Sequence, residues 1–119
     1  MFTTYSNTEA MIMDGNIYLL QYGTYISKDV MEENTKRLDN YLIVEEDDKY
    51  YVYVGAFINK DNALKLQKIF ENNNIYTYLK NDYLDSTIID KIKNIENKEI
   101  ENNNLQEVNN KILNELKKI

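Results

Sequence analysis

Tyrosine is the residue type in this chain that most readily supports binding chemistry. The sequence contains 11 tyrosines but no histidine and no cysteine. This composition removes Cys and His zinc sites, thiol chemistry and the commonest general base. Because Asn, Lys, Ile and Tyr are all used heavily, the positions of the tyrosines carry more information than their number. Tyrosines that share a surface suit a ligand with apolar faces and polar edges, such as a sugar chain or a splayed base.

The acidic run Glu45-Glu46-Asp47-Asp48 is the other group of side chains that could do chemistry. Four carboxylates can attract a calcium ion, but their oxygen spacing fits no known calcium loop. A glycosidase uses a pair of carboxylates, yet water at a hairpin tip would keep these groups ordinary acids. We therefore predict a solvated turn at this run. For the chain as a whole we predict no catalytic residue, no metal site and no cofactor, so that the protein is not an enzyme.

The charge balance restricts the partners. The formal net charge is −6 and the isoelectric point is about 4.7. Nucleic acid and anionic lipid are held largely by basic patches, so both are disfavoured. The longest apolar runs are far shorter than the ~20 residues that span a bilayer, and the N-terminus lacks the pattern of a signal peptide. If the protein works outside the cytoplasm, we expect its membrane anchor in a segment outside this chain.

Apolar periodicity divides the chain into three parts. Residues 1–15 are predicted to be an irregular lead-in, 16–84 a folded domain and 85–119 a helical C-terminal extension. The extension carries two amphipathic stripes, and Asn102-Asn103-Asn104 is predicted to interrupt them.

The domain alternates strands and helices. Ser27 is predicted to cap a helix that runs to about Asp39 and buries a stripe of Val30, Met31 and Leu38. Asn59 is predicted to cap a second helix, after a strand that ends where Gly55 lets the chain bend. The predicted strands lie at 16–25, 41–45, within the stretch 49–63, and at 75–80.

The two halves of the domain repeat at an offset of 32 residues, which pairs Gly23 with Gly55 and Ser27 with Asn59. Two such units give the order βαββαβ, which is ferredoxin-like or RNP-like. We therefore predict an α+β fold, with a four-stranded antiparallel sheet and two helices on one face. The opposite face would be open to solvent.

Strand alternation assigns residues to the two faces of this sheet. The set predicted to face the helices is Leu20, Tyr22, Val52, Val54, Ile75 and Leu79. For the strand at 41–45 the alternation is ambiguous. The set predicted on the open face is Leu19, Gln21, Tyr51, Tyr53, Tyr76, Tyr78 and Lys80. Four tyrosines and a glutamine are unusual there, because a solvated sheet face normally carries Lys, Glu and Thr.

Two motifs resemble the repeats of the SPOR domain, the sporulation-related repeat of bacterial cell-division and spore-forming proteins. The first is Leu20-Gln21-Tyr22-Gly23-Thr24-Tyr25, and the second runs from Tyr50 to Phe57 and continues into Asn59-Lys60-Asp61-Asn62-Ala63. The resemblance covers about residues 16–82. The sequence departs from the family in having tyrosine at position 53, where arginine is frequent, and in lacking tryptophan.

The resemblance implies non-catalytic binding of peptidoglycan glycan strands that lack stem peptides. It also implies an extracytoplasmic protein, targeted to the division septum or the spore envelope. Carried over by position, the glycan-binding residues would be Gln21, Thr24, Tyr51, Tyr53, Tyr76 and Tyr78.

Two other interpretations stay open. Single-stranded RNA binding uses the same topology and stacks bases on sheet aromatics, but it predicts a basic surface that only Lys80 and Lys49 could supply. In the second, the helices of residues 85–119 cover the open face, or pair with a copy of the chain or with another protein.

Overall fold

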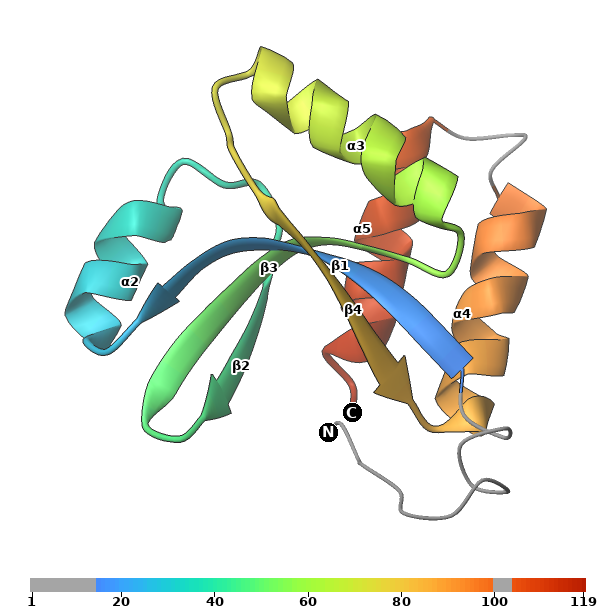
Figure 1. Ribbon diagram of the computed structural model, residues 1–119, viewed down its shortest axis with the longest axis horizontal. Helices are drawn as coiled ribbons and strands as arrows, with labels where there is room; N and C mark the ends of the chain where they lie inside the picture. Colours follow the sequence, from blue (N-terminus) through green and yellow to red (C-terminus); the bar gives the residue numbers. More distant parts are fainter. Residues whose placement is uncertain (1–14, 100–103) are drawn as a thin grey trace.

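The computed structural model describes residues 15–99 and 104–119. The strands form one antiparallel sheet of four strands in the order β2-β3-β1-β4. The predicted α+β fold with a C-terminal helical extension is therefore confirmed. Residues 1–14 of the predicted lead-in, and Asn102 and Asn103 of the predicted break, lie outside the described residues. In chain order the elements are β1 (Gly15–Tyr25), α2 (Lys28–Thr35), β2 (Leu42–Glu46), β3 (Lys49–Phe57), α3 (Lys60–Asn72), β4 (Tyr78–Leu84), α4 (Ser86–Glu99) and α5 (Leu105–Leu116) (Figure 1).

Both predicted helix caps are confirmed. The Ser27 hydroxyl accepts from the backbone N–H of Val30, and the Asn59 side chain accepts from that of Asp61. The predicted end of the first helix at Asp39 is wrong, because α2 ends at Thr35. In so short a helix only one side meets the sheet, so Met31 is buried while Val30 is exposed.

The fourth strand begins later than predicted. Residues 75–77 precede β4, because the chain is still closing α3: Asn74 has φ 62° and the Ile75 N–H donates to the Phe70 carbonyl at 2.8 Å. The left-handed residue reverses the chain at the helix end. The register then pairs Gln21 with Tyr78, and Gly15 with Leu84.

Gly55 lies inside β3 rather than at a bend after it. A Cβ atom there would come 2.8 Å from Leu20 Cδ1 and 3.1 Å from Leu66 Cδ2. Glycine therefore allows α3 to approach the sheet closely. Glycine is needed at position 23 for a different reason. A Cβ atom there would clash with the Tyr25 ring, at 2.5 Å from the hydroxyl oxygen.

The acidic run forms the predicted hairpin turn. Asp47 and Asp48 take φ values of 53° and 61° between the paired residues Glu46 and Lys49. Positive φ at both central residues is the geometry of a tight two-residue hairpin, and aspartate tolerates it better than most residues. All four carboxylate residues are exposed.

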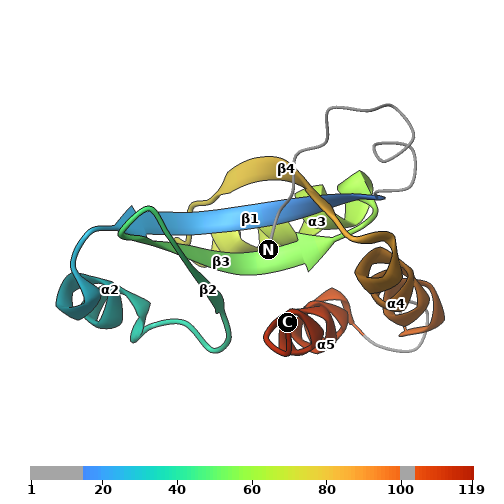
Figure 2. The same cartoon turned by 90° about the horizontal axis from the view of Figure 1, so that it is seen from below.

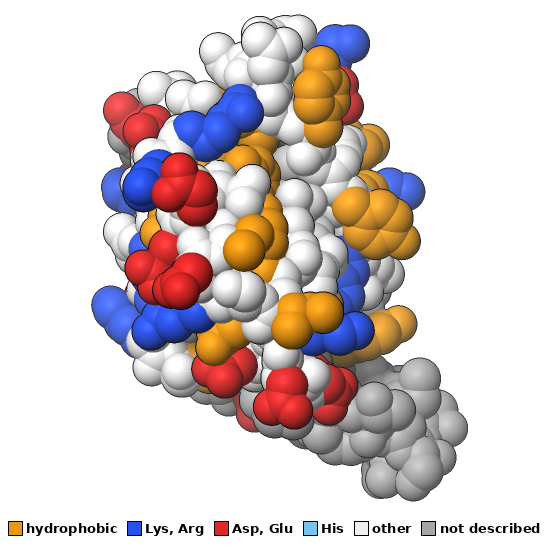
Figure 3. Space-filling model, turned by 90° about the vertical axis from the view of Figure 1, so that its left-hand side faces the viewer, with side chains coloured by type: hydrophobic (Ala, Val, Ile, Leu, Met, Phe, Trp, Pro, Cys, Tyr) orange, Lys and Arg blue, Asp and Glu red, His pale blue; other side chains and the backbone are white. Residues whose placement is uncertain are grey.

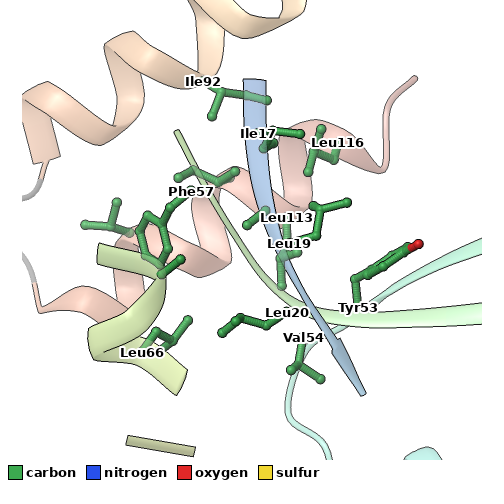
Figure 4. Close-up of a cluster of buried hydrophobic side chains, with 14 of the residues drawn as sticks. Ile17, Leu19, Leu20, Tyr53, Val54, Phe57, Leu66, Ile92, Leu113 and Leu116 are labelled. Atoms are coloured by element: carbon green, nitrogen blue, oxygen red, sulfur yellow. The ribbon is translucent and has the colours of Figure 1, made fainter. Parts of the chain in front are cut away.

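Helices pack against the sheet from two directions. α3 lies behind the sheet in Figure 2, while α5 and α4 lie below β3 in that view. In Figure 4, Leu20 points toward Leu66 of α3, whereas Ile17 and Leu19 lie toward α5. The buried cluster on that second side includes Ile17, Leu19, Ile92, Leu113 and Leu116. Each such side chain contributes about 1.5–3 kcal/mol when fully buried.

Two buried polar side chains fix the C-terminal helices to the sheet. Asn109 of α5 accepts from the Ala56 N–H at 2.9 Å and donates to the Val54 carbonyl at 2.9 Å. It thereby satisfies the edge of β3 beyond the residues that pair with β2. Glu96 of α4 accepts from the backbone N–H groups of Ile58 and Asn59 at 2.6 and 3.0 Å. None of the helices within the described ranges is long and apolar enough to cross a membrane.

Candidate ligand-binding face of the sheet

The candidate site is the face of the sheet that points away from α3. Paired residues on neighbouring strands share a face, so the register identifies its members. Tyr53 pairs with Gln21, which pairs in turn with Tyr78, and Tyr51 pairs with Thr24. The structure thus brings five of the six predicted site residues onto one face. Tyr76 precedes β4, and no strand pairing places it beside the others.

One end of this face is covered and the other is not. Ile17 and Leu19 are fully buried, so the prediction that Leu19 lies open is wrong, because α4 and α5 pack over this end. Beyond Leu19 the same strand carries Gln21, which is partly exposed, and Thr24, which is exposed. We call the uncovered part, made of Gln21, Thr24, Tyr51, Tyr78 and Lys80, the open end.

The tyrosines of this face differ in what they offer. Tyr78 is 68% exposed, so its ring is available to a ligand. Tyr51 is partly buried, and Tyr53 is only 1% exposed. The Tyr53 ring therefore supports the site from within and leaves stacking on a ligand to its neighbours. Tyr76 is also 68% exposed, outside the strand.

Lys80 lies across the rings of β3. Its Nζ is 5.6 Å from the ring centroids of both Tyr51 and Tyr53, within the range of a cation–π contact. It donates to the Tyr53 hydroxyl at 3.1 Å and lies 3.7 Å from Oδ2 of Asp82. Strand alternation in the sequence predicts that Lys80 lies on this face. The sequence did not indicate that Lys80 extends across β1 to contact two tyrosines of β3.

The surroundings of Lys80 keep it charged. Burial alone would lower the pKa of the ammonium group. The hydrogen bond and charge interaction with Tyr53, and then the carboxylates of Asp82 and Glu46, outweigh burial and raise the pKa above its ordinary 10.5. Lys80 is therefore a fixed positive charge at neutral pH.

Gln21 and Thr24 form a polar pair beside the rings. The Gln21 amide nitrogen donates to the Thr24 hydroxyl oxygen at 2.8 Å. This bond leaves the amide carbonyl as an acceptor and the hydroxyl hydrogen as a donor for a ligand. The register shifts between Leu20 and Gly23, and this irregularity lets both side chains reach the same face.

An apolar groove adjoins the open end between β2 and the C-terminal end of α5. Its volume is about 370 Å³. Leu42 pairs with Tyr53, and Val44 pairs with Tyr51. The alternation that was ambiguous in the sequence is thereby resolved, because Leu42 and Val44 lie on the same face as these tyrosines. Sequence reasoning missed the groove, because it depends on where α5 ends. Its lining includes Leu42, Val44, Leu84, Leu116 and Ile119.

Charged side chains of both signs are mixed on the side of the molecule drawn in Figure 3. Lysine and arginine alternate there with aspartate and glutamate, and no large basic patch is visible on that face. That side therefore offers no cluster of positive charge of the kind that nucleic acid needs.

No model of a known protein family matches the chain, and no curated protein matches it. Among solved structures, the chain is similar to the solution structure of the peptidoglycan binding domain of the B. subtilis cell wall lytic enzyme CwlC. The two are 23% identical, with a TM-score of 0.47, over 69% of this chain and 99% of that chain.

Proposed function

We propose that the protein is a non-catalytic module that binds peptidoglycan glycan strands, preferring strands without stem peptides, through the open end of the sheet. The observation that carries this proposal is the grouping on one face of the exposed Tyr78 ring, the partly buried Tyr51 ring and the Gln21–Thr24 pair. Sugars have apolar faces and hydroxyl edges, and this grouping offers a partner for each. The resemblance of the two repeat motifs to the SPOR domain supports the same ligand class.

The proposal assigns different roles to the predicted site residues. Tyr78 and Tyr51 would stack on sugar rings, while Gln21 and Thr24 would hydrogen-bond to their polar edges. Tyr53 would act through its hydroxyl by holding Lys80. Tyr76 would contribute only if the ligand extends past Tyr78 to the residues that precede β4.

The proposed place of action is the cell envelope, at the division septum or around the developing spore. This follows from the ligand, because peptidoglycan lies outside the cytoplasmic membrane. Self-association or a partner protein at α4 and α5 is a further proposal that the covered end permits.

Co-sedimentation with purified sacculi tests the proposal, before and after an amidase removes the stem peptides. The wild type should pellet with treated sacculi, and Tyr78→Ala should pellet at least about fivefold less, because loss of one stacked ring costs about 1 kcal/mol or more. Tyr83→Ala is the matched control, since Tyr83 is 43% exposed on the same strand but points to the other face. Absence of pelleting with both preparations, or equal loss in the two variants, would refute the proposal.

A further inference from the structure

The ammonium group of Lys80 lies beside the rings of Tyr51 and Tyr53, where it can affect which ligands bind. The side chain of Lys80 is 34% exposed, and its Nζ is held by the Tyr53 hydroxyl at 3.1 Å. Its Nζ also lies 5.6 Å from the centroids of the Tyr51 and Tyr53 rings. A sugar stacked on Tyr78 and Tyr51 would therefore meet a fixed cation beside these rings.

The ammonium group keeps capacity for another acceptor. It has three N–H donors, and the Tyr53 hydroxyl takes one of them. The 3.7 Å separation from Asp82 exceeds hydrogen-bond distance, so that contact is an ion pair only. A ligand oxygen that approaches along the open end could thus accept a charge-assisted hydrogen bond from Lys80.

We propose that Lys80 makes the site selective for glycans that carry a free carboxylate, with the lactyl carboxylate of N-acetylmuramic acid as its partner. This inference rests on the proposed function. In intact peptidoglycan that carboxyl group is tied up in an amide bond with the stem peptide. An amidase frees it as a carboxylate, one negative charge for every second sugar. Lys80 would then distinguish peptide-free strands from intact ones by binding the carboxylate that removal of the peptide exposes.

Asp82 sets the strength of this selectivity. Its carboxylate competes with the ligand for the same ammonium group, and Glu46 adds negative charge nearby. Replacing Asp82 with asparagine removes the competing charge and keeps a similar shape. Asp82→Asn should therefore bind the anionic glycan more tightly, a change opposite in sign to that of a Lys80 variant.

Calorimetric titration of three soluble ligands tests the inference. The ligands are a peptide-free tetrasaccharide of alternating N-acetylglucosamine and N-acetylmuramic acid, the same compound with its carboxyl groups reduced to alcohols, and the tetrasaccharide of chitin. The wild type should bind the first about tenfold more tightly than the other two, as one charge-assisted hydrogen bond allows. Lys80→Met, which keeps an unbranched apolar stem, should bind all three alike, and Lys80→Arg should retain selectivity.

Lys65→Met is the control for removal of a lysine, because Lys65 is exposed on α3, away from this face. It should leave both affinity and selectivity unchanged, and thermal unfolding should show all variants folded. Equal binding of the three ligands by the wild type, together with weaker binding of all three by Tyr78→Ala, would overturn the inference and leave the proposed function standing. If the wild type bound neither the three soluble ligands nor peptide-free sacculi, both the inference and the proposed function would be overturned.

Discussion

The two ends of one sheet face differ, because one end is buried under helices and the other is exposed to solvent. At one end Ile17 and Leu19 are buried under α4 and α5, and at the other Gln21 and Thr24 meet solvent. All four residues come from the same strand. What separates the ends is the position of the C-terminal helices, which stop covering the face beyond Leu19. A helical extension can therefore stabilise a sheet and still leave a site open on it.

The C-terminal helices belong to the same core as the sheet. Leu113 and Leu116 of α5 share a buried cluster with residues of β1 and β3, and Asn109 binds the β3 backbone. The covered end is thus where stability should be concentrated, and the open end is where binding should be concentrated. Three predictions separate these roles.

The largest effect on stability is expected from truncation at the covered end. Leu113→Ala should lower the free energy of unfolding by about 2–5 kcal/mol, the usual cost of a large-to-small change in a packed core. Tyr78→Ala at the open end should change it by no more than about 0.5 kcal/mol, since the ring is mostly in water. Urea unfolding followed by circular dichroism measures both. Similar losses in the two variants would mean that the ends are not distinct.

A smaller loss is expected when α5 loses its bond to the edge of β3. Asn109→Ala leaves the Ala56 N–H and the Val54 carbonyl without their partner and should cost about 1–3 kcal/mol. The control is Asn94→Ala, an exposed position of α4. Hydrogen exchange at Ala56 should accelerate only in the Asn109 variant. Unchanged exchange there would show that the amide pair does not protect this edge.

The smallest expected effect is a pH dependence confined to the open end. Because the pKa of Lys80 is raised in the folded protein, its charge contributes stability that is fully present below pH 10.5 and is lost as the pH rises through the folded-state pKa. The stability difference between wild type and Lys80→Met should therefore be constant from pH 7 to about pH 10 and shrink above 10.5. The corresponding difference for Leu113→Ala should not follow this curve. If this stability difference already shrank at a pH below 9, the result would contradict the environment assigned to Lys80.

Local signals in the sequence were sufficient for the order of the elements. Period-2 alternation predicted the strands, and Ser27 and Asn59 fixed the starts of α2 and α3, because each supplies an acceptor for an otherwise unpaired N–H. Alternation also placed Gln21, Tyr51, Tyr53, Tyr78 and Lys80 on one face. The 32-residue repeat and the match of each site residue to a ligand stay predictions.

Boundaries and exposure depended on contacts that are remote in sequence. The start of β4 is set by its register with β1 and by the turn at Asn74, neither of which alternation contains. The burial of Leu19 depends on α5, whose amphipathic pattern shows an apolar side but not the surface it meets. The contact of Lys80 with two rings of β3 passes over β1, so no local pattern could report it.

Chemical-shift mapping tests the central claim most directly. The backbone amides of the isotopically labelled protein would be followed while a peptide-free glycan oligosaccharide is added. If the open end is the binding site, the largest shifts will fall at Gln21, Thr24, Tyr51, Tyr78 and Lys80, while Ile17 and the α5 residues Val108 to Leu113 stay still. Shifts centred on α4 and α5, or no shifts at saturating ligand, would contradict it.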